Sequence, residues 1–274
     1  MPSNVNLYQA VLDILGAQCC IIPIGDPAYE NAARTTVTTR GNGVGDGLVF
    51  TYSEAIKDWD GPPYETRSPY RIPVVRFNGS DEEADSPDAA FWSRDDSAGQ
   101  GFSLGFWTNY ALTGVFQAMF GKWGAGQKEW TFFVSGDKLR LVLNDTLAAK
   151  EVDRRASNAL PFGIPLLLVA TYDGSGGATA MDGAILYANG EVEVSTASNQ
   201  ALYVSMQNGT SVVTLGERSA GSGAWMNIIA GGPFGPFFTH SKLTAANVRD
   251  LYQLGVEYFL KAGFGPEPTR IGRR

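Results

Sequence analysis

The sequence has little of the side-chain chemistry on which many enzymes and disulfide-rich proteins depend. Its two cysteines, Cys19 and Cys20, are adjacent, so they cannot close the loops of a disulfide framework. Its single histidine, His240, would have to serve any serine triad or histidine-based metal cage, and no Gly-x-Ser-x-Gly elbow accompanies it. We interpret His240 as a surface or helix-capping residue.

Positive charge and long apolar runs are also scarce. The net charge is −7 and the sequence pI is about 4.8, which argues against nucleic acid or an anionic membrane as the main partner. The apolar run over residues 14–24 is too short to span a bilayer, so we expect no membrane insertion. The N-terminus lacks the pattern of a signal peptide, which predicts synthesis in a cytoplasm without signal-directed export.

Short strands separated by turn residues dominate what is present. Residues 183–195 contain two alternating segments around Asn189-Gly190, the pair that favours a two-residue hairpin turn. Helices are expected over residues 3–15 and after Thr244, and no helices alternate with the strands, so a parallel α/β sheet is disfavoured. The predicted strands cover residues 48–52, 74–78, 101–110, 115–122, 129–135, 139–144, 164–172, 183–188, 191–195, 211–216 and 226–230.

This pattern predicts an all-β jelly-roll sandwich with a short N-terminal helix and a C-terminal helix. We predict an N-terminal extension over residues 1–72 that packs onto the same domain and is irregular from residue 17 onward. The jelly roll is expected over residues 73–262. Residues 263–274 are predicted to form a C-terminal arm.

Five segments in order resemble a laminin-G-like module of the concanavalin A-like jelly-roll superfamily. The segments that carry the resemblance are Val75–Gly79, Phe102–Trp107, Ala170–Gly174 followed by Ile185–Gly190, Thr214–Gly216 and Leu243–Tyr252. Modules of this type bind glycans, proteins or calcium, or pack as building blocks, so the resemblance implies a fold and leaves the role open.

The sequence departs from the family pattern in two places. Residues 164–169 are wholly apolar where the family strand often carries a tryptophan and a histidine. Residues 228–238 form an apolar, Gly/Pro-rich run where the family is usually charged. That run is either buried between sheets or exposed as a patch for a partner chain.

Paired carboxylates are the usual signature of glycosidases related to this fold. The best pair is Glu191 and Glu193, which share one face of a strand. Because Val192 and Val194 would then point inward, we expect both glutamates to face solvent. We predict no catalytic residue.

Two sets of residues are candidates for ligand contacts. Oxygen ligands for a calcium ion would come from Asp81, Asp85 and Asp173, although no EF-hand spacing is present and no cofactor is otherwise implied. Tryptophans beside Gly-rich turns could be exposed and stack on sugars, and these are Trp123, Trp130 and Trp225.

The leading hypothesis is a non-catalytic structural or interaction protein, a component of a phage or virus particle that mediates assembly or surface attachment. Its partners would be other protein chains of the assembly, including copies of itself, and its location the virion surface or another extracellular assembly. The alternative is a lectin-like module that binds a cell-surface glycan, with or without calcium. A glycoside hydrolase ranks last, because the carboxylate strand is missing.

Overall fold

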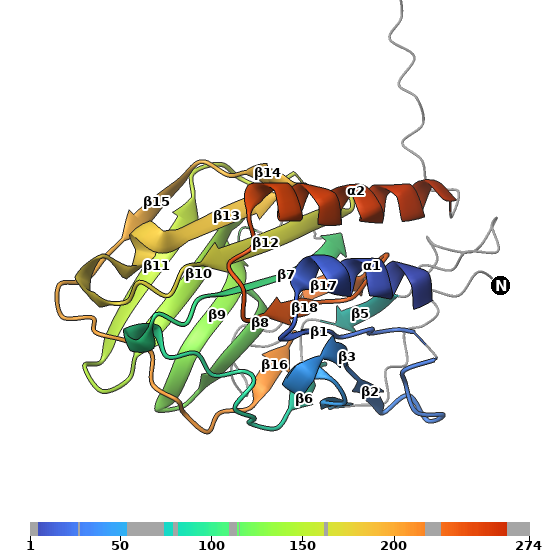
Figure 1. Cartoon of the computed structure of the whole chain (residues 1–274), viewed down its shortest axis with the longest axis horizontal. Coiled ribbons are helices and arrows are strands. Elements are labelled where there is room, and N and C mark those ends of the chain that lie inside the picture. The colour runs from blue at the N-terminus through green and yellow to red at the C-terminus, as the bar shows by residue number, and fades with distance from the viewer. Residues whose placement is uncertain are drawn as a thin grey trace, which may run out of the picture.

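The computed structural model describes residues 5–26, 28–53, 74–78, 82–109, 114, 116–161, 164–216 and 226–261. Two antiparallel sheets pack face to face, and two helices cover the outer face of one of them (Figure 1). The prediction of an all-β jelly-roll sandwich with helices near both ends is confirmed. No helix in these ranges is both long enough and apolar enough to cross a membrane.

Sheet A lies under the helices. Its main path runs β14-β13-β12-β7-β18-β1-β3, and β17 pairs with both β7 and β5. The strands are β1 (Cys19–Ile21), β3 (Arg40–Asn42), β5 (Val74–Asn78), β7 (Phe102–Asn109), β12 (Leu166–Tyr172), β13 (Ala184–Ala188), β14 (Glu191–Val192), β17 (Met226–Gly231) and β18 (Phe237–Thr239).

Sheet B forms the opposite layer, in the order β15-β11-β10-β9-β8-β16-β6-β4-β2. Its strands are β2 (Thr36–Thr38), β4 (Val49–Tyr52), β6 (Ala84–Ser86), β8 (Gln117–Gly124), β9 (Gln127–Ser135), β10 (Lys138–Asp145), β11 (Lys150–Ala156), β15 (Ser195–Ser198) and β16 (Val213–Leu215).

Both faces of sheet A are buried, which explains the apolar run in β12. Leu166 and Leu168 point into the core between the sheets, whereas Leu167 and Val169 join the core beneath the helices. A strand covered on both faces reads as a continuous apolar run rather than an alternating one. The departure from the family pattern at residues 164–169 therefore has a packing cause.

Aromatic rings fill the centre of the sandwich. Phe238 stacks on Trp130 with 5.1 Å between ring centres and on Phe102 with 5.4 Å, and all three side chains are fully buried. Phe234 and Phe237 are also fully buried, in the core beneath the helices. At these three phenylalanines, the buried alternative for the apolar run is the one observed.

The helices α1 (Val5–Leu15) and α2 (Ala245–Lys261) contact each other on sheet A. The predicted cap is confirmed, because the Asn247 amide donates to Thr244 Oγ1 at 3.2 Å. Helix α2 buries Val248 and Leu251 in the core beneath the helices. Trp107 of β7 lies there too and stacks on Tyr252 with 5.8 Å between ring centres.

The hairpin at Asn189-Gly190 is confirmed. Both residues have positive φ, 52° and 83°, as a type I′ turn requires, and Tyr187 pairs with Val192 across it. The prediction that Val192 and Val194 point inward is wrong, because they are 57% and 67% exposed. The edge strand β14 is only two residues long, and the chain then crosses to β15 of the other sheet.

The strand predicted over residues 48–52 is confirmed as β4 of sheet B. The rest of the stretch from residue 17 was predicted to be irregular, and this is wrong where the structure describes it, because β1 and β3 extend sheet A and β2 extends sheet B. These three strands have three residues each, too few to show a period-2 pattern. The prediction likewise missed β11, whose sequence Lys150–Ala156 is rich in charge.

Gly255 of α2 tests the packing of this helix on Trp107. A Cβ atom at Gly255 would lie 2.2 Å from Trp107 Cζ2. Alanine normally stabilises a helix relative to glycine by about 1 kcal/mol. We nevertheless expect Gly255→Ala to lower the free energy of unfolding by about 1–3 kcal/mol in urea titrations, because the added methyl group would overpack the contact with Trp107. The control Gln253→Ala, exposed on the same helix, should change it by less than about 0.5 kcal/mol. Equal stability of the Gly255→Ala variant and the parent would contradict the close contact.

Candidate functional site

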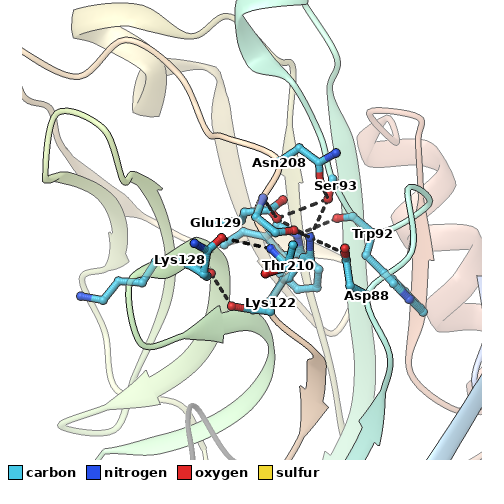
Figure 2. Close-up of polar contacts among 12 residues, drawn as sticks. Asp88, Trp92, Ser93, Lys122, Lys128, Glu129, Asn208 and Thr210 are labelled. Atoms are coloured by element: carbon cyan, nitrogen blue, oxygen red, sulfur yellow. Dashed lines mark hydrogen bonds and ion pairs between the residues drawn. The ribbon is translucent and has the colours of Figure 1, made fainter.

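A buried pair of opposite charges lies in the β8–β9 hairpin of sheet B. Lys122 of β8 and Glu129 of β9 are both 0% exposed, although lysine and glutamate are almost never fully buried unless they are paired. A salt bridge joins Lys122 Nζ to Glu129 Oε1, within the group of polar contacts drawn in Figure 2. We treat the residues around this pair as the candidate functional site.

A β-bulge turns Glu129 toward Lys122. Lys122 pairs with Trp130, whereas the next residue, Trp123, pairs with Lys128, so Glu129 is the extra residue in β9. Bulges of this kind change the direction of a side chain and are common beside functional sites. If the pairing were regular here, the side chains of β9 would alternate between the two faces of the sheet, and Glu129 and Trp130 would point in opposite directions.

The Lys122 ammonium is surrounded by oxygen atoms of four residues from three segments of the chain. Besides Glu129, it donates to Ser93 Oγ at 2.6 Å and to the Gly209 carbonyl at 2.6 Å. Asp88 Oδ1 lies 2.8 Å away in a second salt bridge. Two carboxylates, a hydroxyl and a carbonyl therefore enclose one positive charge. We call these four residues the oxygen cage.

Glu129 connects the cage to the segment that follows β15. Its Oε1 accepts hydrogen bonds from the Gly209 amide at 2.9 Å and from Ser93 Oγ at 3.3 Å. Its Oε2 is buried and has no hydrogen-bond partner among the described residues. Burial raises the pKa of Glu129 to about 7, even though Lys122 and the hydrogen bonds oppose that rise.

Two more buried carboxylates hold the same segment. Asp96 accepts from the Met206 amide at 2.7 Å and from the hydroxyls of Tyr203 and Tyr172 at 2.8 and 2.9 Å. Asp145 accepts from the Val204 amide at 3.0 Å. The pinned segment, residues 203–211, belongs to no strand, so these carboxylates satisfy amides that a sheet would otherwise pair.

The pinned segment presents polar side chains to solvent directly over the cage. Asn208 and Thr210 are exposed, while Gly209 between them is buried. The Thr210 amide donates to Gln127 Oε1 at 3.1 Å, which joins the segment to the tip of the β8–β9 hairpin. Asp88 and Gln127 are also exposed. We call Asp88, Gln127, Asn208 and Thr210 the rim surface.

The exposure that we predicted for two of the tryptophans is wrong. Trp130 is fully buried between the sheets, where its Nε1 donates to the Trp92 carbonyl at 2.9 Å. Trp123 is 4% exposed, and Lys128 Nζ lies 5.1 Å from its ring centre. Trp225 lies outside the described residues. A sugar-stacking role for these residues stays a prediction.

The predicted calcium ligands are not gathered where they are described. Asp85 belongs to β6 of sheet B, whereas Asp173 follows β12 of sheet A and pairs with Lys242 at 3.3 Å. Asp81 lies outside the described residues. Within the described ranges, no group of three His, Cys, Asp or Glu residues is placed to hold a metal ion.

His240 is neither a surface residue nor a helix cap, contrary to our interpretation. It is half-buried and stacks on Phe91 with 4.8 Å between ring centres, and its Nε2 lies 2.8 Å from the Phe91 carbonyl. Burial lowers the pKa of its imidazole, which favours the neutral form.

The residues that make up the site were missed, because a single charged residue in a strand normally indicates the solvent face. The signals in the sequence were Lys122 beside Trp123 and Glu129 beside Trp130, charges set in strands rich in aromatic residues. Such charges are either solvent-facing or buried as a pair, and one sequence alone does not distinguish the two.

The raised pKa of Glu129 predicts how the pair responds to pH. The folded-state pKa of about 7 exceeds the ordinary 4.5, so the folded protein binds more protons between these values. The contribution of Glu129 to stability is therefore full below about pH 4.5 and falls as pH rises through about 7. We expect the advantage in free energy of unfolding of the parent over Glu129→Gln to shrink between pH 5 and pH 8. Burial also raises the pKa of Asp96, but Asp96 is present in both proteins, so its effect on stability cancels in the difference. A constant difference across this range would contradict the assignment.

No protein-family model and no curated protein sequence matches this chain. Its fold is similar to that of solved toxin domains. The botulinum neurotoxin serotype G binding domain is 13% identical with a TM-score of 0.56, and the match covers 87% of this chain and 51% of that one. The binding domain of Paraclostridial Mosquitocidal Protein 1 is 12% identical with a TM-score of 0.59, covering 88% and 52%.

A third similar structure is the botulinum neurotoxin serotype D ligand-binding domain in complex with N-acetylneuraminic acid. It is 10% identical with a TM-score of 0.54, and the match covers 90% of this chain and 52% of that one. The chain thus spans about half the length of the solved structures it matches. At these identities the similarity establishes the fold alone, and the resemblance to laminin-G-like modules in particular stays a prediction. The chain has the concanavalin A-like jelly-roll fold.

Proposed function

We propose that this chain is a non-catalytic module that binds a glycan at the rim surface. The observation that carries the proposal is the placement of exposed polar side chains over a backbone segment fixed by buried charges. A carboxylate, two amides and a hydroxyl stand together there, from Asp88, Gln127, Asn208 and Thr210. These groups donate and accept hydrogen bonds, as recognition of sugar hydroxyls requires.

The rigidity of the pinned segment supports binding. The segment is held at Val204 by Asp145, at Met206 by Asp96 and at Gly209 by Glu129. A surface that is ordered before it meets its ligand loses less conformational entropy on binding. The rim surface is therefore better suited to recognition than a loop that must be ordered by the ligand.

The same geometry argues against hydrolysis. Glu129 has the raised pKa expected of a general acid, but a general acid must reach within hydrogen-bond distance of its substrate. Neither Glu129 nor Lys122 has any exposed surface. Glu191, from the pair considered in the sequence, is exposed and forms a 3.5 Å ion pair with Arg249.

The structural comparisons support a sugar ligand over a purely structural role. The serotype D domain was solved with N-acetylneuraminic acid, and the other two similar structures are toxin binding domains. The match covers only about half of each of these chains. These similar structures therefore support a binding module with this fold, and they do not identify the position of the binding site. The virion role and the virion or extracellular location stay predictions.

A glycan array followed by calorimetric titration tests the proposal. We expect a glycan to bind the parent chain, and Asn208→Ala combined with Thr210→Ala to raise its Kd by about tenfold or more, because exposed hydrogen-bonding groups are lost. The matched control is Ser198→Ala with Gln200→Ala, two exposed polar residues elsewhere, which should leave the Kd unchanged. An array with no hit, or equal losses in both double variants, would count against binding at the rim surface.

A further inference from the structure

The oxygen cage has the composition of a divalent-cation site, but a lysine fills it. Calcium sites in proteins are built from carboxylates, carbonyls and other oxygen ligands. Lys122 Nζ is enclosed by Asp88 Oδ1, Glu129 Oε1, Ser93 Oγ and the Gly209 carbonyl. The ligands come from three segments of the chain, the β6–β7 connection, β9 and the pinned segment, as they do when an ion joins separate segments. The cage and the predicted calcium ligands Asp81, Asp85 and Asp173 share no residue.

We propose that the Lys122 ammonium is a built-in cation that takes the place of a metal ion in this cage. The parent protein then needs no metal there, and a variant without the ammonium takes up Ca²⁺. The cage shares Asp88 with the rim surface, but this proposal concerns cation binding and holds whatever ligand the rim surface binds.

The dimensions of the cage suit calcium after a small contraction. Lys122 Nζ lies 2.6 Å from the oxygens of Ser93 and Gly209 and 2.8 Å from Asp88 Oδ1. Calcium–oxygen distances are about 2.3–2.6 Å. Each ligand therefore has to move by a few tenths of an ångström. Asp88 is the most exposed of them, with 33% of its side chain open to solvent, so neighbouring groups restrict its position least.

The number of available oxygens and the charge of the cage also suit calcium. Glu129 Oε2 is buried without a hydrogen-bond partner among the described residues, so it is available as a second oxygen of a bidentate carboxylate. Calcium takes about 6–8 oxygens, and water can reach the remaining positions past the partly exposed Asp88. When both carboxylates are ionised, the cage carries two negative charges. The Lys122 ammonium neutralises one of these charges, whereas a divalent cation would neutralise both.

A covalently attached cation has a clear physical advantage here. The cage joins the β8–β9 hairpin to Ser93 before β7 and to the pinned segment. A metal ion would stabilise these contacts only in proportion to its concentration relative to its Kd. A lysine on β8 cannot dissociate, so the pinned segment keeps its position when calcium is scarce.

Thermal unfolding and terbium luminescence of Lys122→Ala test the proposal. We expect the Tm of the parent to be the same in Ca²⁺ and in EDTA. The Lys122→Ala variant should have a lower Tm in EDTA, raised by saturating Ca²⁺ by about 5 °C or more. It should also bind one terbium ion that Ca²⁺ displaces.

Two control variants separate ion binding from a general effect of the substitution. Lys122→Met removes the charge but keeps a long apolar side chain in the space, so it should show no response to Ca²⁺. Lys122→Ala combined with Glu129→Gln removes a carboxylate and should lose most of the calcium-dependent rise in Tm. If Lys122→Ala does not fold in EDTA, it is refolded in Ca²⁺, and recovery of the native circular dichroism there supports the proposal.

Three results would overturn the proposal. One is a saturable calcium response of the parent that Asp88→Asn abolishes, because the cage would then bind metal with the lysine present. Another is a Lys122→Ala variant that shows no calcium response, whether it folds or fails to refold. The last is an intact mass of the parent lower by one water molecule, with the loss mapped to Asp88 and Lys122, because an amide bond would have replaced the ion pair.

Discussion

The backbone of residues 203–211 leaves both sheets, and its amides still need partners away from water. Buried carboxylates supply them: Asp145 for Val204, Asp96 for Met206 and Glu129 for Gly209. A carboxylate is a stronger acceptor for an amide than a neutral carbonyl, but burying its charge is costly unless it is compensated. The arrangement of the whole loop end of the sandwich follows from how each of these charges is compensated.

Two of these carboxylates, Asp96 and Glu129, are compensated in different ways. Asp96 receives hydrogen bonds from the neutral hydroxyls of Tyr172 and Tyr203 and from the Met206 amide. Glu129 depends on Lys122, so one partner cannot be removed without leaving the other buried and uncompensated. A buried ion pair contributes little net stability compared with apolar residues that fill the same space, but breaking one by removing a single partner is strongly destabilising. The pair therefore serves mainly to fix position, because only one arrangement of the segment satisfies it.

The features of the fold that depend on local chemistry could be predicted from the sequence. The Asn189-Gly190 turn and the Thr244 cap each involve neighbouring residues, and the structure has both. The orientation of Val194 could not be predicted, because it depends on where the chain crosses between sheets. Trp130 was misjudged for a similar reason: proximity to a Gly-rich turn says nothing about which face of β9 it occupies.

The candidate site was harder to predict, since it rests on a register shift. A period-2 pattern identifies the face of a strand only while the pairing is regular, and the extra residue in β9 is Glu129 itself. The cage also joins Asp88, Lys122 and Gly209, which are far apart in the chain and meet only after both sheets have formed. No local sequence signal predicts such a meeting.

The division between buried and exposed groups explains how one segment serves two purposes. Gly209 faces inward, where its amide and carbonyl contact Glu129 and Lys122. Its neighbours Asn208 and Thr210 are exposed, although the Asn208 side-chain oxygen also accepts a hydrogen bond from Ser93 Oγ at 2.7 Å. A side chain at Gly209 would place a Cβ atom 2.8 Å from Gln127 Oε1, which would disturb the contact that joins the segment to the hairpin. A substitution at Gly209 would therefore first displace the Gln127 side chain, and with it the hydrogen bond from the Thr210 amide.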